Sequence, residues 1–237
     1  MSLIIRALRL LDGHYGDLKW WPGKTPFEVI VGAILTQNTA WINVEKAIRA
    51  LKSARLLSLK GMRRAPLAVI ARCVRPSGYY NQKALKLKGF IEFVDREYGG
   101  SLSRMRHEKT PALREKLLDV RGVGPETADS MLCYALNRPV FVVDAYTRRI
   151  FGRLGALRSG EDYEEIRNLF ESSIISYIIE KRGGRRGVPG RRLLRILNQF
   201  HACIVMAGKD FCHKNSPDCA SCPLHGLKRC RVDQVNG

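Results

Sequence analysis

Two apolar helical stripes are interrupted by a glycine-containing break near residue 123. The first stripe ends at Val120 and the second begins at Ala128, so residues 122–124, Gly-Val-Gly, must reverse the chain between two helices. Glycine adopts positive φ at little cost, and Pro125 suits the first position of a helix, where no N–H donor is needed. The sequence therefore predicts a helical hairpin with a tight turn.

The same turn has the properties of a phosphate-binding site. The N–H groups at a helix N-terminus carry partial positive charge, and Gly122 and Gly124 would leave them unscreened by side chains. An ordinary turn between two packed helices uses the same residues, so the turn by itself leaves both interpretations open.

The chain is strongly basic. Its 237 residues include 41 Lys and Arg against 22 Asp and Glu, a formal net charge of +19. Charge that serves solubility alone is the alternative, but this excess is larger than solubility needs and favours a polyanionic partner. No apolar run is long enough to span a membrane, and the first residues lack the pattern of an export signal. We therefore expect a cytoplasmic, nucleoid-associated protein with no membrane partner.

Helical periodicity dominates the sequence. Apolar residues recur at helical spacing in residues 4–11, 26–35, 163–179 and 193–206, which predicts an all-α fold. Residues 36–39, Thr-Gln-Asn-Thr, form a polar break that we interpret as a turn between two core helices.

Two segments depart from this pattern. The apolar residues 140–143 have the periodicity of a strand, but in an otherwise helical chain we interpret them as a buried connector. Residues 181–192 form a basic, glycine-rich run that is typical of a mobile, solvated loop, with phosphate contacts as the alternative.

The three tryptophans, Trp20, Trp21 and Trp41, lie at the borders of the apolar helix 26–35. Large aromatic side chains usually pack in a core or at its rim. Aromatic faces also hold bases that have been flipped out of a duplex. Chemistry alone favours packing and leaves base stacking as the alternative.

Four of the seven cysteines follow the pattern C-x6-C-x2-C-x7-C near the C-terminus. These are Cys212, Cys219, Cys222 and Cys230. An odd number of cysteines without an export signal argues against disulfides. Four closely spaced thiolates suit a four-coordinate site for zinc or an iron–sulfur cluster, and the spacing alone favours zinc.

The hairpin resembles that of the helix-hairpin-helix DNA glycosylases of the endonuclease III superfamily. Their hairpin reads like L-P-G-V-G-x-K-T-A and is followed by an essential aspartate in a V-D-x-x-x-x-R segment, and residues 118–128 and 143–149 match this pattern. Residues 20–39, with W-W-P ahead of F-E-x-x-x-G-A-x-L-T-Q-N-T, further resemble the 3-methyladenine DNA glycosylase branch. The resemblance extends from about residue 20 to residue 230.

This resemblance implies a two-domain helical fold. Residues 26–138 would form a multi-helix barrel that includes the hairpin, and residues 1–25 with 139–237 a second helical domain, with the base held in the cleft between them. The cysteine loop, residues 212–230, would hold a [4Fe-4S] cluster, with zinc as the less favoured occupant. The last spacer of the family's motif is x5 and is two residues longer in this chain.

The resemblance also implies roles for single residues. Asp144 would stabilise the oxocarbenium-like sugar and orient water, while also capping the helix 145–153. Gln37 matches a glutamine that fills the gap left by the extruded nucleotide. The family's lyase lysine falls at position 126, where this chain has Glu126, which cannot form a Schiff base. The implied base pocket comprises Trp20, Trp21, Trp41, Gln37 and Glu126, and the implied DNA contacts are Gly122, Val123, Gly124, Thr127 and Arg148.

We therefore expect a monomeric, monofunctional DNA N-glycosylase of base excision repair that acts on double-stranded DNA with a damaged base. Alkylated purines such as 3-methyladenine are the expected lesions, because cationic rings stack well on tryptophan. A uracil or mismatched-thymine glycosylase is the alternative in the same class. A bifunctional glycosylase and AP lyase like endonuclease III, or a non-enzymatic DNA-binding protein, is less favoured.

Overall fold

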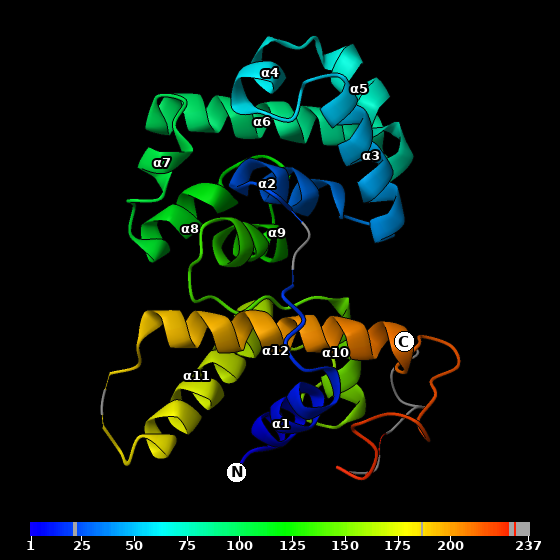
Figure 1. Cartoon of the computed structure of the whole chain (residues 1–237), viewed down its shortest axis with the longest axis vertical. Coiled ribbons are helices and arrows are strands. Elements are labelled where there is room, and N and C mark those ends of the chain that lie inside the picture. The colour runs from blue at the N-terminus through cyan, green and yellow to red at the C-terminus, as the bar shows by residue number, and fades with distance from the viewer. Residues whose placement is uncertain (21–22, 186, 228–229, 231–237) are drawn as a thin grey trace. The chain divides into compact units, whose positions relative to one another are not determined.

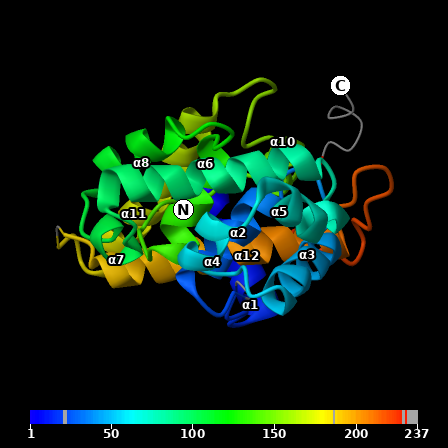
Figure 2. The same cartoon turned by 90° about the horizontal axis from the view of Figure 1, so that it is seen from above.

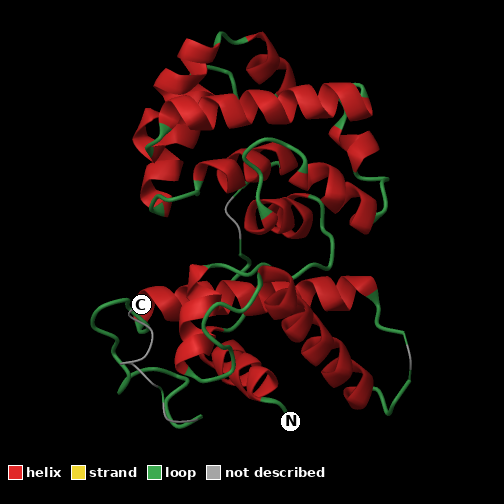
Figure 3. Cartoon of the chain, turned by 180° about the vertical axis from the view of Figure 1, so that it is seen from behind, coloured by secondary structure: helices red, strands yellow, loops and turns green. Residues whose placement is uncertain are grey.

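A computed structural model of the chain describes residues 1–20, 23–185, 187–227 and 230. Within these residues the structure consists of helices and loops without a strand (Figure 3), which confirms the predicted all-α class. The chain divides into two compact units: Trp21–Arg138 is one, and Met1–Trp20 with Pro139–Gly237 is the other. In the described ranges, no helix is both long enough and apolar enough to cross a membrane.

The unit Trp21–Arg138 is built around one buried helix and one long helix. Its elements are α2 (Pro26–Leu35), α3 (Trp41–Ser53), α4 (Leu59–Arg64), α5 (Leu67–Val74), the 3-10 helix η1 (Arg75–Ser77), α6 (Tyr80–Tyr98), α7 (Leu102–Met105), α8 (Thr110–Leu118), α9 (Pro125–Ser130) and the π-helix η2 (Met131–Ala135). Every residue of α2 after Pro26 is buried, as its apolar run predicts. The long helix α6 has α4 and α5 on one side and α2 on the other (Figure 1). Figure 2 shows α6 along its full length.

A buried lysine joins three elements of this unit. Lys83 is only 2% exposed, and its Nζ donates to Leu35 O at 2.9 Å and to Ser77 O at 2.6 Å. Leu35 ends α2 and Ser77 ends η1, so the ammonium group satisfies carbonyl groups that have no partner inside their own helices. Burial, together with the charge of Lys86, lowers the pKa of Lys83 to about 8.

The second unit packs four helices around aromatic rings. These are α1 (Leu3–Tyr15), α10 (Ala145–Arg153), α11 (Tyr163–Lys181) and α12 (Gly190–Asp210). Phe170 of α11 stacks on Phe141 at a centroid distance of 4.4 Å and meets the edge of Phe151 at 4.7 Å. Helix α1 extends beyond the expected end at residue 11 and terminates at Gly16, whose φ of 61° ends the helical conformation.

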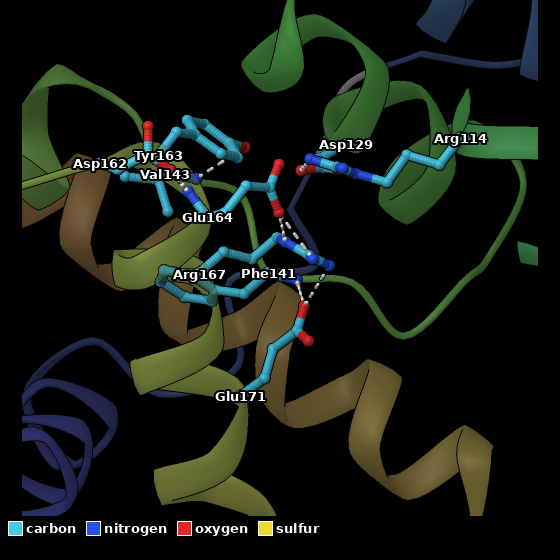
Figure 4. A network of polar contacts seen from close by, with 9 residues as sticks. All are labelled: Arg114, Asp129, Phe141, Val143, Asp162, Tyr163, Glu164, Arg167 and Glu171. Atoms are coloured by element: carbon cyan, nitrogen blue, oxygen red, sulfur yellow. Dashed lines mark hydrogen bonds and ion pairs between the residues drawn. The ribbon is translucent and has the colours of Figure 1, made fainter. Parts of the chain in front are cut away.

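The connector that leads into α10 is buried, as predicted, and is not a strand. Residues 140–143 are at most 3% exposed and have no helical or strand assignment. Side chains of α11 accept their N–H groups: Phe141 N donates to Glu171 Oε1 at 2.8 Å, and Val143 N donates to Tyr163 Oη at 3.3 Å (Figure 4). Buried backbone donors need partners, so these bonds replace a neighbouring strand and fix the path of the chain into α10.

Candidate functional site

The predicted hairpin is confirmed between α8 and α9. Gly122 has a φ of 83°, which favours glycine, and Val123 turns its side chain into the core, where it is 4% exposed. Gly124 is the N-cap of α9, and a Cβ atom placed there would have no neighbour within 4 Å. The backbone at the start of α9 is therefore sterically open, as a phosphate-binding turn requires.

An ion pair holds the two helices of the hairpin together. Arg114 of α8 donates from Nε to Asp129 Oδ1 at 2.7 Å and from Nη2 to Asp129 Oδ2 at 3.0 Å (Figure 4). The Asp129 side chain is fully buried. A buried carboxylate bound in this bidentate manner fixes the orientation of α9 against α8.

Gln37 lies against the hairpin, although it is far from it in sequence. Its Nε2 donates to Gly122 O at 3.0 Å and to Thr127 Oγ1 at 2.8 Å, and its Oε1 accepts a hydrogen bond from Lys86 Nζ. The structure thus brings Gln37, expected in the base pocket, together with Gly122 and Thr127, expected to contact DNA. Sequence reasoning missed Lys86, because no motif distinguishes it among the 41 Lys and Arg of the chain.

The tryptophans expected in the base pocket lie in different surroundings. Trp41 donates from Nε1 to Glu45 Oε1 at 2.9 Å and lines a cavity of about 210 Å³ in the unit Trp21–Arg138. Trp20 is half-buried in the other unit, where Lys209 Nζ lies 5.5 Å from its ring centroid. Trp21 lies outside the described residues.

Asp144 caps helix α10, as expected from the sequence. Its Oδ1 accepts hydrogen bonds from Thr147 N at 2.7 Å and from Thr147 Oγ1 at 2.9 Å, and its Oδ2 lies 3.5 Å from His201 Nε2. Burial raises the pKa of Asp144, but the close approach of the His201 imidazole and the hydrogen bonds from Thr147 outweigh it, so this pKa lies below the usual range. The Asp144 side chain is 13% exposed and is therefore a partly accessible anion at neutral pH.

Two further expected site residues are exposed. Glu126 lies in the first turn of α9, where the helix dipole favours a carboxylate. Arg148 of α10 is exposed and donates from Nη1 to Glu161 O at 2.7 Å.

The cysteine loop follows α12. Cys212 is buried, Cys219 and Cys222 are half-buried, and Cys230 is exposed. Partial burial of the thiol, and then the charges of Cys219, Cys212 and Cys222, raise the pKa of Cys230 to about 11. In the described part of the chain, no three metal-ligating side chains are arranged to hold a metal ion.

A buried arginine contacts this loop. Arg153 is 1% exposed, and its Nη1 donates to Cys212 Sγ at 3.2 Å and to His213 O at 2.7 Å, while Nη2 donates to Lys214 O at 2.8 Å. The described partners of this buried cation are thus a sulfur atom and two carbonyl oxygens. A buried guanidinium needs negative charge nearby, which a thiolate at Cys212 would supply.

Known proteins resemble this chain in sequence. The model of the HhH-GPD superfamily base excision DNA repair proteins matches residues 31–174. The chain is 40% identical over 224 residues to a provisionally assigned DNA repair glycosylase of Methanocaldococcus jannaschii, and the match covers 94% of each chain.

Solved structures give the same result. The H. pylori 3-methyladenine DNA glycosylase bound to 1,N6-ethenoadenine is 32% identical, with a TM-score of 0.74 over 88% of this chain and 98% of that one. A non-covalent complex of endonuclease III with DNA has a TM-score of 0.75 over 98% of this chain and 96% of that one. Its 21% identity shows a likeness of fold alone.

Proposed function

This chain belongs to the HhH-GPD superfamily of base excision DNA repair proteins, and from that premise we propose that it is a monofunctional DNA N-glycosylase for alkylated purines such as 3-methyladenine. Its class, a DNA glycosylase of base excision repair, follows from the family match and from the 40% identical relative. The lesion and the absence of lyase activity are the specific parts of the proposal.

The observation that carries the chemistry is the position of the Asp144 carboxylate at the start of α10, between Thr147 and His201. Cleavage of an N-glycosidic bond leaves positive charge on the sugar, which a nearby carboxylate stabilises while it orients the attacking water. Thr147 binds one carboxylate oxygen and His201 faces the other. The pKa of Asp144 lies below its usual range, so the side chain is charged at the pH at which it would act.

The hairpin supports binding of double-stranded DNA. The open N-terminus of α9 at Gly124 offers N–H groups to a phosphate, and the excess of cations attracts the backbone of a duplex. In this proposal Gln37 leaves its partners Gly122 and Thr127 and fills the gap left by the extruded base.

The proposed substrate class rests on the tryptophans and on the structural relative. A cationic purine such as 3-methyladenine would stack on electron-rich tryptophan rings, and Trp41 lines a cavity within its own unit. The 32% identical H. pylori protein is a 3-methyladenine DNA glycosylase and was solved with an ethenoadenine base. Excision without strand incision follows from Glu126, because a carboxylate cannot form the Schiff base on which lyase chemistry depends.

We also propose that Cys212, Cys219, Cys222 and Cys230 hold a [4Fe-4S] cluster, with zinc as the alternative. A four-thiolate cluster is anionic, and the buried Arg153 guanidinium beside Cys212 Sγ would compensate that charge. The group would be structural and would fix the loop after α12.

A panel of duplexes, each with one lesion, tests the proposed function by detection of the released base. We expect release of 3-methyladenine and related alkylated purines, intact strands before alkali, and no release by Asp144→Asn. Release of uracil or of mismatched thymine alone would assign the alternative specificity. Tight DNA binding without any released base would identify a non-enzymatic DNA-binding protein.

A further inference from the structure

We propose that His201 of α12 is a positioning residue that holds Asp144 ionised and correctly oriented for base excision. The proposal rests on the proposed glycosylase function of Asp144 and adds a residue that no sequence motif marks. His201 and Asp144 lie 57 positions apart, on α12 and at the start of α10, and both belong to the same unit.

The two oxygens of the Asp144 carboxylate face different elements. Oδ1 is held from within α10 by the N–H and hydroxyl groups of Thr147. Oδ2 faces His201 Nε2 across 3.5 Å, which is longer than an ideal hydrogen bond but within the range of an ion pair. The hydrogen bonds from Thr147 would fix Oδ1 but would still allow the carboxylate to rotate and move Oδ2. The His201 imidazole fixes Oδ2, and it therefore determines which lone pairs of the carboxylate are directed outward.

His201 is itself held in place. Its side chain is 6% exposed, and its ring meets Phe141 edge to face, at a centroid distance of 6.2 Å and an interplanar angle of 90°. The helices α10 and α12 also approach closely, because Tyr146 packs against Gly208, where an added Cβ would lie 2.1 Å from the Tyr146 ring. A buried imidazole on a fixed helix can therefore impose its geometry on the carboxylate.

Three charged side chains on α10 and α11 are bound elsewhere. On α10, Arg148 donates to Glu161 O, and Arg149 donates to Cys212 O and to Gly208 O. On α11, Glu171 accepts from Phe141 N. His201, by contrast, has its Nε2 at 3.5 Å from Asp144 Oδ2.

Burial disfavours the charged form of a carboxylate, and His201 acts against this effect. The transition state needs the anion, with an unshared lone pair of the carboxylate directed at the sugar cation. Loss of the imidazole should therefore reduce the rate of the chemical step more than it reduces DNA affinity.

The test compares His201→Ala and His201→Gln with the wild type in single-turnover base release at saturating lesion DNA. We expect His201→Ala to lower the rate about ten- to a hundredfold, as misplacement of a reacting group does, and to leave the Kd for DNA within about twofold. His201→Gln retains an amide donor of similar reach and should recover part of the rate. The acidic limb of the rate profile should move to higher pH in His201→Ala.

A matched control separates positioning from stability. Leu197 is 1% exposed and lies one turn earlier on α12, so Leu197→Ala should lower the Tm without changing the rate of the folded enzyme. Equal rate losses in Leu197→Ala and His201→Ala, at a temperature where both are folded, would overturn the proposal.

A second readout does not require activity. The carboxyl carbon of Asp144, labelled with ¹³C and assigned by comparison with Asp144→Asn, reports its own titration by NMR. Its midpoint should lie below the usual range for aspartate in the wild type and rise in His201→Ala, whether or not any base is released. An unchanged midpoint would refute the role of His201, whereas a raised midpoint in a protein that releases no base would refute only the proposed glycosylase function.

Discussion

Gln37 Nε2 and Thr127 Oγ1 are joined by a hydrogen bond of 2.8 Å between residues that lie 90 positions apart in the sequence. The bond ties the turn after α2 to the first turn of α9. Gln37, which we propose enters the duplex, is therefore hydrogen-bonded to the hairpin that we propose binds the duplex.

Removal of the Gln37 side chain should affect duplex substrates specifically. Gln37→Ala should lower the rate of base release from a duplex lesion about tenfold, equivalent to ~1.4 kcal/mol, because nothing fills the vacated stack. Release from a single-stranded lesion should be unchanged. Thr127→Val is the control, since it breaks the bond to Gln37 and keeps the glutamine; a loss in this variant as large as in Gln37→Ala would argue that the contact is merely structural.

The two glycines of the hairpin should respond differently to substitution. Gly124 has open space around it and a φ of −90°, so Gly124→Val should fold normally but block approach of a phosphate and weaken duplex binding at every salt concentration. Gly122→Ala should instead lower the free energy of unfolding by about 1–3 kcal/mol, because φ is 83° and the new Cβ would lie against Lys86.

Fluorescence anisotropy across a salt series measures the first effect, and urea denaturation measures the second. Gly13→Val serves as the control, because Gly13 also has open space and lies on α1. Wild-type affinity in a correctly folded Gly124→Val protein would place the DNA contact elsewhere.

The buried Lys83 should make stability depend on alkaline pH. Its pKa is about 8 in the folded protein, below the value of 10.5 for a free lysine, so the unfolded chain binds more protons between these limits. Its contribution to the free energy of unfolding is therefore greatest above pH 10.5 and is lost as pH falls through 8. Urea titrations from pH 7 to 9.5 should show the wild type gaining stability relative to Lys83→Met as pH rises. A constant difference across this range would contradict the lowered pKa.

Local chemistry made the helices and the hairpin predictable. Thr25, Asp144 and Asp162 each accept an N–H of the helix that follows, and such capping residues can be read from a few neighbouring positions. The apolar run 26–35 likewise specifies a buried helix through its own composition.

The partners of the site residues were not predictable in the same way. His201 faces Asp144 and Lys86 binds Gln37 only because distant helices pack together, and periodicity contains no information on such pairing. Arg153 was equally hidden, since its contact with Cys212 Sγ spans 59 positions. Sequence motifs identified the residues proposed to act on DNA, and the fold was needed to find the residues that hold them.

The cysteine loop should contain iron when the protein is purified without oxygen. We expect about four irons per chain, as in a [4Fe-4S] cluster, and a brown protein. Cys219→Ser should lower the iron content and the Tm without first affecting the rate of the folded enzyme. Cys73→Ser, which lies outside the motif, should keep the iron content and the Tm of the wild type. A colourless protein with one zinc per chain would reject the iron assignment and keep the four ligands.

The last prediction separates the two carboxylates of the proposed site. Asp144→Asn keeps the size of the side chain but removes the charge that stabilises the sugar cation, so base release should fall by orders of magnitude while DNA affinity is retained. Glu126→Gln should have a milder effect, because Glu126 is exposed in the first turn of α9 and contributes local charge.

Borohydride should trap no covalent complex between the wild type and lesion DNA, since trapping needs an amine that forms a Schiff base. Glu126→Lys places an amine at the position of the lyase lysine and should form a covalent complex that borohydride traps. Lys83→Met is the control, because it removes a buried amine. Efficient trapping by the wild type would mean that another amine attacks the sugar, and the enzyme would then be bifunctional.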